Sequence, residues 1–316
     1  MSAMEALYLA FIALAGLGMG SLVTLMIGHI MSEHWLAPVR AEVEAAVLTL
    51  PLLLLLGLVL ALGLDQIFPW IDDRAELSPT RAAFLSPAFF LLRSAFYLLA
   101  SASIAFWLIR TPHVRRASGI GLALMTPIMT FAAYDWVLSR EPHWWSSLFG
   151  LAFAQSQILA ALAGAILITL LGAEHASLKR MKSLERALLT LLLLTLWTWF
   201  AQFLIVWLTN LPHEAVWYLR RSDPGNITLV TTAFALMIAA IIVLVPSGVS
   251  RIGMIIGSAL ALMHHATHML WILQPKREAS WMDLSLIVGV AILWAAAFAF
   301  IMRSRPTYAE EASEEP

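Results

Sequence analysis

The sequence contains about nine long apolar stretches, each of a length that can cross a lipid bilayer as an α-helix. Lipid offers no partners for peptide hydrogen bonds, so only helices or closed barrels can span it. A helical crossing needs roughly 20 apolar residues. The sequence therefore predicts an all-α, polytopic integral membrane protein. The stretches expected to cross are Ala6–Ile30, Ala45–Leu64, Pro87–Ile109, Ala117–Leu138, Ser146–Leu171, Ala187–Thr209, Ile227–Val245, Val249–Leu273 and Met282–Met302.

Composition agrees with this class and excludes several functions. Of 316 residues, 61% are hydrophobic and only 12% are charged, whereas soluble domains carry about 25% charged residues. The net charge of -1 indicates no nucleic-acid partner. The absence of cysteine excludes disulfides, thiolate-bound Fe–S clusters and covalent c-type haem on this chain. We expect one membrane domain, residues 1–305, followed by an acidic, disordered cytoplasmic tail, residues 306–316.

The basic residues of the connections are divided unequally between the two sides of the membrane. If the stretches alternate in direction, eleven Lys and Arg lie on one side and seven on the other, with Arg93 inside a stretch. Connections rich in Lys and Arg tend to stay in the cytoplasm. We therefore expect the N-terminus outside and the C-terminus in the cytoplasm.

One carboxylate, Asp135, lies inside the fourth stretch near its outer end. An ionised side chain in lipid is costly unless it is paired or hydrated. Arg93 lies about two turns, roughly 10 Å, into the third stretch from the same side, so we expect an ion pair between the two. Two interpretations stay open: a proton relay whose carboxyl group is tuned by the arginine, or a static link between two helices.

Further ionisable residues gather on the same outer side. Asp65 ends the second stretch, Glu141 and His143 lie in a short turn with two tryptophans, and Glu214 follows the sixth stretch. The tryptophans are typical of the membrane–water boundary. We expect Asp65, Glu141, His143 and Glu214 to accompany Asp135 in a proton path or a quinone contact.

Three histidines lie in the outer half of the eighth stretch. His264 and His268 are four residues apart and share one helix face with that spacing, which can ligate a metal. A b-type haem would need a second histidine at equal depth, whereas His29 is expected at the opposite leaflet. We therefore expect no metal or haem on this chain. A neutral cluster of His264, His265 and His268 can instead relay protons or bind a quinone carbonyl.

Smaller signals predict how the helices pack. Gln202 and the glutamines of the fifth stretch are expected to form hydrogen bonds between helices, each worth about 0.6–2 kcal/mol, with a quinone contact at Gln202 as the alternative. The glycine run at 16–20 is expected to allow close helix packing. Pro51 and Pro127 are expected to kink the second and fourth helices.

Two stretches resemble the signatures of the ActF subunit of alternative complex III. The first is residues 131–150, FAAYDWVLSREPHWWSSLFG, and the second is residues 200–219, FAQFLIVWLTNLPHEAVWYL. A weaker match, FFLLR, covers residues 89–93. The general similarity extends from about Arg40 to Leu273. The chain departs from the family in having nine stretches instead of ten, and in having His265 and His268 where an Arg-x-x-Asp pattern is expected.

The resemblance implies an NrfD-like pair of four-helix bundles in the bacterial inner membrane. It implies a non-haem subunit of a quinol:cytochrome c oxidoreductase that is not catalytic alone, with quinone contact or proton conduction toward the periplasm. The expected partners are an ActC-like subunit, a periplasmic Fe–S protein and multihaem cytochromes c, which carry the Fe–S clusters and haem c. Two alternatives remain: a docking subunit of that complex without chemistry, and a secondary transporter.

Overall fold

The computed structural model of the chain describes residues 2–31, 35–172, 178–246, 250–274 and 280–305. In these ranges nine helical segments are long and apolar enough to cross a membrane, which confirms the all-α, polytopic prediction. The tail predicted to be disordered, 306–316, lies outside the described residues. The nine segments are Ala3–Met31, Ala37–Ala61, Pro87–Arg110, Val114–Arg140, Phe149–Leu171, Met181–Thr209, Pro224–Leu244, Arg251–Leu273 and Trp281–Met302.

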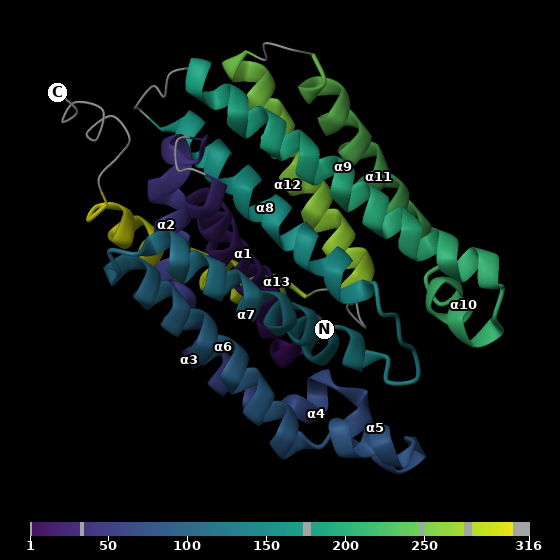
Figure 1. Cartoon of the computed structure of the whole chain (residues 1–316). Helices are drawn as coiled ribbons and strands as arrows, with labels where there is room; N and C mark the ends of the chain where they lie inside the picture. Colours follow the sequence, from purple (N-terminus) through teal and green to yellow (C-terminus); the bar gives the residue numbers. More distant parts are fainter. Residues whose placement is uncertain (1, 32–34, 173–177, 247–249, 275–279, 306–316) are drawn as a thin grey trace.

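The contacts between these segments divide eight of them into two bundles of four. The first bundle consists of α1 (Ala3–Met31), α2 (Arg40–Leu48) continued by α3 (Leu50–Ala61), α6 (Pro87–Arg110) and α7 (Val114–Trp136). The second consists of α8 (Phe149–Leu171), α9 (Leu178–Thr209), α11 (Pro224–Leu244) and α12 (Arg251–Leu273). Helices α1 and α7 pack on α8 and join the bundles, while α13 (Trp281–Met302) lies against α1 and α2 (Figure 1).

Several short helices gather at the end of the molecule where α1 begins, which we call the N-terminal end. Helices α7 and α12 finish at this end, and α8 and α13 start there (Figure 1). On the opposite side, the described residues of the connections contribute one short helix, the 3₁₀ turn η2 (Ala37–Val39). The short helices at the N-terminal end are α4 (Leu64–Ile67), η3 (Pro69–Ile71), η4 (Arg74–Glu76), α5 (Pro79–Phe84), η5 (Leu138–Arg140) and α10 (Pro212–Leu219).

Helix α1 lies in the centre because its glycines allow two neighbours to approach closely. A Cβ atom on Gly20 would lie 2.5 Å from the backbone oxygen of Gln157 in α8. A Cβ atom on Gly18 would lie 2.7 Å from the Leu50 side chain. At Gly20 the neighbour is backbone, so a side chain there would push α1 and α8 apart, whereas at Gly18 the end of the Leu50 side chain can shift. The predicted close packing at residues 16–20 is confirmed.

The helix ends and breaks follow local chemistry. The second span breaks between α2 and α3 at Thr49, two residues before Pro51, whose missing N–H and ring disfavour the preceding helical turn. The Thr49 hydroxyl donates to the Ala46 carbonyl (2.7 Å) and accepts the indole N–H of Trp294 in α13 (2.9 Å). Helix α7 is continuous through Pro127.

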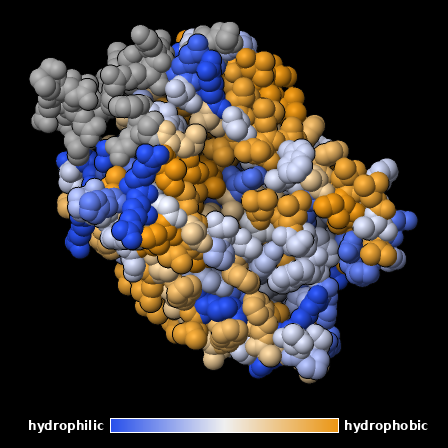
Figure 2. All heavy atoms as spheres, in the orientation of Figure 1, coloured by the Kyte–Doolittle hydropathy of each residue, from blue (hydrophilic) through white to orange (hydrophobic). Residues whose placement is uncertain are grey.

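Large apolar side chains cover much of the outer surface, as expected where lipid is the solvent. Leu58 of α3 is 66% exposed and Leu62, directly after α3, is 84% exposed, while Leu293 and Phe300 of α13 are 73% and 75% exposed. Figure 2 shows orange, hydrophobic residues over much of the visible face. Polar side chains such as Asp135, Gln202 and His264 are instead buried in the interior.

Candidate functional site

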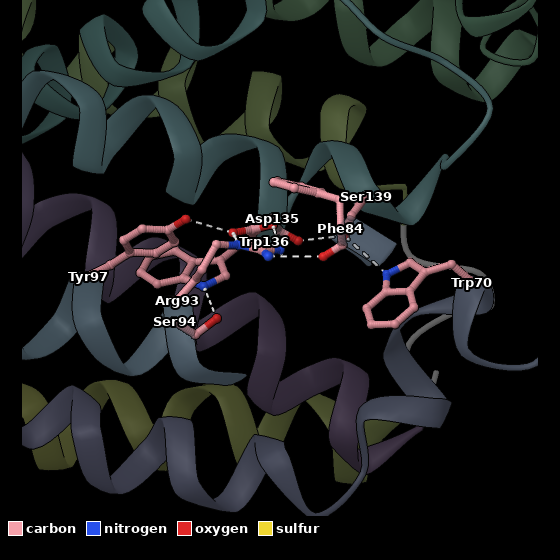
Figure 3. A network of polar contacts seen from close by, with 8 residues as sticks. All are labelled: Trp70, Phe84, Arg93, Ser94, Tyr97, Asp135, Trp136 and Ser139. Atoms are coloured by element: carbon pink, nitrogen blue, oxygen red, sulfur yellow. Dashed lines mark hydrogen bonds and ion pairs between the residues drawn. The ribbon is translucent and has the colours of Figure 1, made fainter. Parts of the chain in front are cut away.

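An ion pair with a fully buried carboxylate and a largely buried guanidinium joins the third and fourth spans near the N-terminal end. The two carboxylate oxygens of Asp135 accept separate hydrogen bonds from Arg93, from Nε at 2.8 Å and from Nη2 at 2.7 Å (Figure 3). The side chain of Asp135 is 0% exposed and that of Arg93 is 12% exposed. The two-pronged geometry is the strongest that a guanidinium and a carboxylate form. The ion pair predicted from the sequence is present.

Helix ends position the two partners. Asp135 lies in the last turn of α7, and Arg93 lies in the second turn of α6. The third donor of Arg93, Nη1, bonds the carbonyl of Phe84 at the end of α5 (2.9 Å). The guanidinium also lies over the rings of Phe84 and Phe89, 3.9 and 4.2 Å from their centroids. These aromatic faces stabilise the cation and shield it from lipid.

Hydroxyl and indole groups complete the network around the pair. The Tyr97 hydroxyl donates to the Asp135 carboxylate at 2.8 Å. The next residue, Trp136, donates from its indole to Ser94 (3.0 Å), and its carbonyl accepts from Tyr8 of α1 (2.7 Å). Helices α1, α6 and α7 are thus held together by polar contacts inside the first bundle. Figure 3 shows the contacts between α6 and α7.

The hydrogen bonds that Asp135 already accepts limit its ability to exchange a proton. Asp135 accepts three hydrogen bonds and its charge is balanced by Arg93. Breaking a buried pair by removing one partner costs about 3–5 kcal/mol. A proton relay through Asp135 therefore requires the arginine to withdraw, whereas a static link between α6 and α7 needs no such movement.

The turn that follows α7 carries a second set of ion pairs. Arg140 donates from Nη2 to Glu5 of α1 at 2.9 Å and from Nη1 to the carbonyl of Leu273, the last residue of α12. Glu141 pairs with the buried Arg221 and lies 3.6 Å from the exposed Arg220. Burial lowers the pKa of the Arg221 guanidinium, and the charge of Glu141 opposes this shift.

The two stretches that carry the family resemblance contact each other at this end. The indole of Trp144 donates to the carbonyl of Glu214 at 2.8 Å. Its ring stacks on Trp217, with centroids 5.0 Å apart and planes inclined by 22°. The Ser146 hydroxyl donates to Gln202 Oε1 at 3.0 Å. Ser146 lies in the connection before α8, so this bond links α9 to that connection and not to another helix, which differs from the prediction. Residues 131–150 and 200–219 thus form one continuous structure.

The histidines lie in the second bundle and contact aromatic residues. His264 Nδ1 bonds the carbonyl of Ala233 in α11 at 2.8 Å. His268 stacks between His264 and Trp271, and the edge of Trp199 meets its ring at 4.7 Å. One ring nitrogen of each of His264, His265 and His268 is buried without a hydrogen-bond partner. Among the described residues, no three His, Cys, Asp or Glu side chains are arranged to hold a metal ion.

The remaining candidates are peripheral to the Asp135 network. Asp65 and His143 are exposed. The carboxylate of Glu214 accepts from Thr209 at 2.8 Å. Apart from Asp65, His143, Glu214 and Gln202, the residues chosen from the sequence fall into three separate groups: the Asp135 network, the ion pairs of the turn, and the histidines of α12.

Sequence reasoning missed four residues that these groups require. Tyr97 lies one helical turn after Arg93, a spacing that places both on one face of α6 and could have revealed it. Glu5 and Tyr8 are the polar residues at the start of α1. Arg221 was counted only as a loop charge, yet its side chain is 4% exposed.

These features define a multi-pass, all-helical membrane protein with buried ion pairs at one end. No protein-family model matches the chain, and no curated protein is similar enough to count as a match.

Proposed function

We propose that the chain is the ActF-type, NrfD-like membrane subunit of an alternative complex III, a quinol:cytochrome c oxidoreductase. The observation that carries the proposal is the contact of the two signature stretches through Trp144, Glu214 and Trp217. The two stretches, about 70 residues apart in the chain, lie together in the fold, so the resemblance falls on one packed region at the N-terminal end. The pairing of four-helix bundles agrees with the same family.

In this proposal the protein lies in the bacterial inner membrane with its N-terminal end toward the periplasm. Its partners are an ActC-like subunit, a periplasmic Fe–S protein and multihaem cytochromes c, which supply the redox centres. This chain contributes quinone contact or proton conduction, with Asp135, Glu141 and the α12 histidines as the groups involved. The Arg-bearing turn 140–143 would then face the Fe–S protein.

A pull-down tests the proposal directly. The tagged full chain is extracted from its native membrane in mild detergent, separated under non-denaturing conditions and stained for haem, and the accompanying chains are identified by mass spectrometry. We expect haem-bearing and Fe–S chains to co-purify. A monomer without haem-bearing partners would refute the proposal and favour a transporter.

A second candidate is a docking subunit without chemistry of its own. The observation that favours it is the full set of hydrogen bonds on Asp135, which leaves neither oxygen free. Asp135→Asn distinguishes the two: chemistry predicts lower quinol turnover or proton yield in an assembled complex, and docking predicts changed yield of complex alone. The exposed Asp72→Asn is the matched control and should change neither.

A further inference from the structure

An apolar cavity of about 510 Å³ lies in the first bundle, between α3 and α6. Leu54 and Leu58 line it from one face of α3, and Leu91, Ala95 and Leu99, spaced by four residues, line it from one face of α6. Leu58, Leu91 and Leu99 are 66%, 37% and 53% exposed, so the cavity opens between the two helices onto the apolar outer surface. Its volume is within the range of small-molecule sites, about 300–1,000 Å³.

The deep side of the cavity is a set of buried aromatic rings, which we call the floor rings: Tyr8, Phe11, Phe68, Phe90 and Trp136. Each of them is at most 6% exposed. Phe11 meets Trp136 edge-on with centroids 5.0 Å apart, and Phe68 meets Phe90 in the same way at 4.9 Å. These edge-to-face contacts hold the rings against one another, so the floor does not collapse into the cavity.

The few polar groups of the wall bond one another. The Tyr8 hydroxyl donates to the carbonyl of Trp136 at 2.7 Å, and the Trp136 indole donates to the Ser94 hydroxyl at 3.0 Å (Figure 3). At most the hydroxyl proton of Ser94 is left for a ligand. The cavity therefore offers almost no polar partner to whatever fills it.

This lining favours hydrocarbon over the other possible contents. A buried water needs two to four polar partners, which the wall does not provide. An empty cavity deprives its lining atoms of dispersion contacts. A quinone ring brings two carbonyl oxygens, of which at most one finds a donor at Ser94, and an unpaired buried acceptor is costly. A hydrocarbon chain fills the volume and brings no polar atom.

We propose that this cavity holds one acyl chain of a membrane phospholipid. The chain enters between α3 and α6, and its end lies against the floor rings. The cavity lies where α3 ends and α6 begins, so the ester groups and the headgroup stay outside, at the N-terminal end of the spans. Because lipid is already apolar, the gain comes from close packing against the floor and not from leaving water. The proposal does not depend on the function proposed above.

Photochemical labelling of the full chain in phosphatidylcholine vesicles tests the site. A small fraction of the phosphatidylcholine carries a carbene-generating group at the end of one acyl chain, and mass spectrometry identifies the labelled residues after irradiation. We expect adducts on Phe11 and Phe90, which are 4% and 3% exposed and are therefore shielded from lipid at the outer surface. Adducts confined to exposed residues such as Leu293 would overturn the proposal.

Ala95→Phe tests the position of the chain, because Ala95 is an exposed lining residue and the added ring occupies the mouth of the cavity. The adducts on the floor rings should be lost, while those on Leu293 should persist. Ala296→Phe, the same change at an exposed residue of α13 outside the cavity, should label as the unaltered chain does. Should Ala95→Phe fold poorly, Leu99→Trp blocks the mouth from another exposed position. Floor labelling that survives the blocking variant would overturn the assignment.

Competition by an isoprenoid quinone tests the alternative occupant. The quinone is added to the same vesicles at the mole fraction of the labelled lipid. Floor labelling should stay unchanged, because acyl chains are far more abundant and fit the cavity without unpaired polar atoms. Loss of floor labelling at this low quinone content would show selective binding of quinone. It would overturn the acyl-chain proposal and leave the function proposed above standing.

Discussion

Replacing Arg93 and Asp135 singly and together reveals how tightly the buried pair is coupled. Arg93→Met leaves a carboxylate that is 0% exposed with Tyr97 as its remaining side-chain donor. Loss of one partner from such a pair costs about 3–5 kcal/mol. Asp135→Leu leaves the guanidinium with a carbonyl and two aromatic rings, and the cost should fall in the same range.

The double variant Arg93→Met with Asp135→Leu should be less destabilised than either single variant. It removes both charges, and apolar replacement of a buried pair is often neutral. The Tyr97 hydroxyl and the Phe84 carbonyl lose their partners, which costs about 1–3 kcal/mol. The interaction energy of the double-mutant cycle should therefore be at least about 2 kcal/mol.

The assay is reversible unfolding of the full chain in mixed micelles, followed by far-UV circular dichroism. Arg220→Met is the control, because its pair with Glu141 is 3.6 Å long and its side chain is 62% exposed; it should cost less than about 1 kcal/mol. The pair would be hydrated and weakly coupled if the loss of stability in the double variant equalled the sum of the two single losses. The same would follow if Arg93→Met cost as little as the control variant. In that case the structural reading of Asp135 fails.

Three further changes test other parts of the structure. Gly20→Ala pushes a methyl group into the backbone of α8 and should lower the free energy of unfolding by about 1–3 kcal/mol. The methyl group of Gly164→Ala lies in open space, so this variant should raise the free energy of unfolding by about 0.5–1 kcal/mol. Equal effects of the two variants would contradict the packing. Trp144→Phe removes the donor to the Glu214 carbonyl and should cost about 1–3 kcal/mol, measured by the same unfolding assay; no loss would show that water replaces the indole. Hydrogen bonds from the Asn226 side chain and from the backbone N–H groups of Asn226 and Gly225 hold the pKa of Asp223 below its usual range. The cap that Asp223 forms therefore stabilises α11 fully above about pH 4, and this stabilisation is lost as the pH falls through the lower pKa of the folded state. Amide exchange at the start of α11 that Asp223→Ala does not change would contradict the cap.

The sequence predicts the spans because hydrophobic length is a local property. It also predicts the Arg93–Asp135 pair, since two charges at similar depth in neighbouring helices have few other partners. The break at Thr49 was foreseen as a kink from Pro51, but the sequence could not reveal that Trp294 bonds Thr49 from a helix 245 residues away.

The ion pairs of the turn escaped prediction for a related reason. Basic residues in connections are read as solvated, yet Arg221 folds back onto the end of α12 and is buried by Trp217, whose ring centroid lies 3.8 Å from its guanidinium. Such burial depends on where α10 and α12 meet in space, which no local pattern records. The separation of the histidines from Asp135 is equally non-local, because it results from their assignment to different bundles.

The attachment of Arg140 to both Glu5 and Leu273 imposes an order on synthesis in the membrane. Glu5 precedes Arg140 by 135 residues, and Leu273 follows it by 133. At a translation rate of about 5–20 residues per second, the second partner emerges roughly 7–27 s after the first contact can form. During that interval the nascent first bundle presents an incompletely bonded arginine at the membrane surface, and insertion of the eighth span completes its bonding.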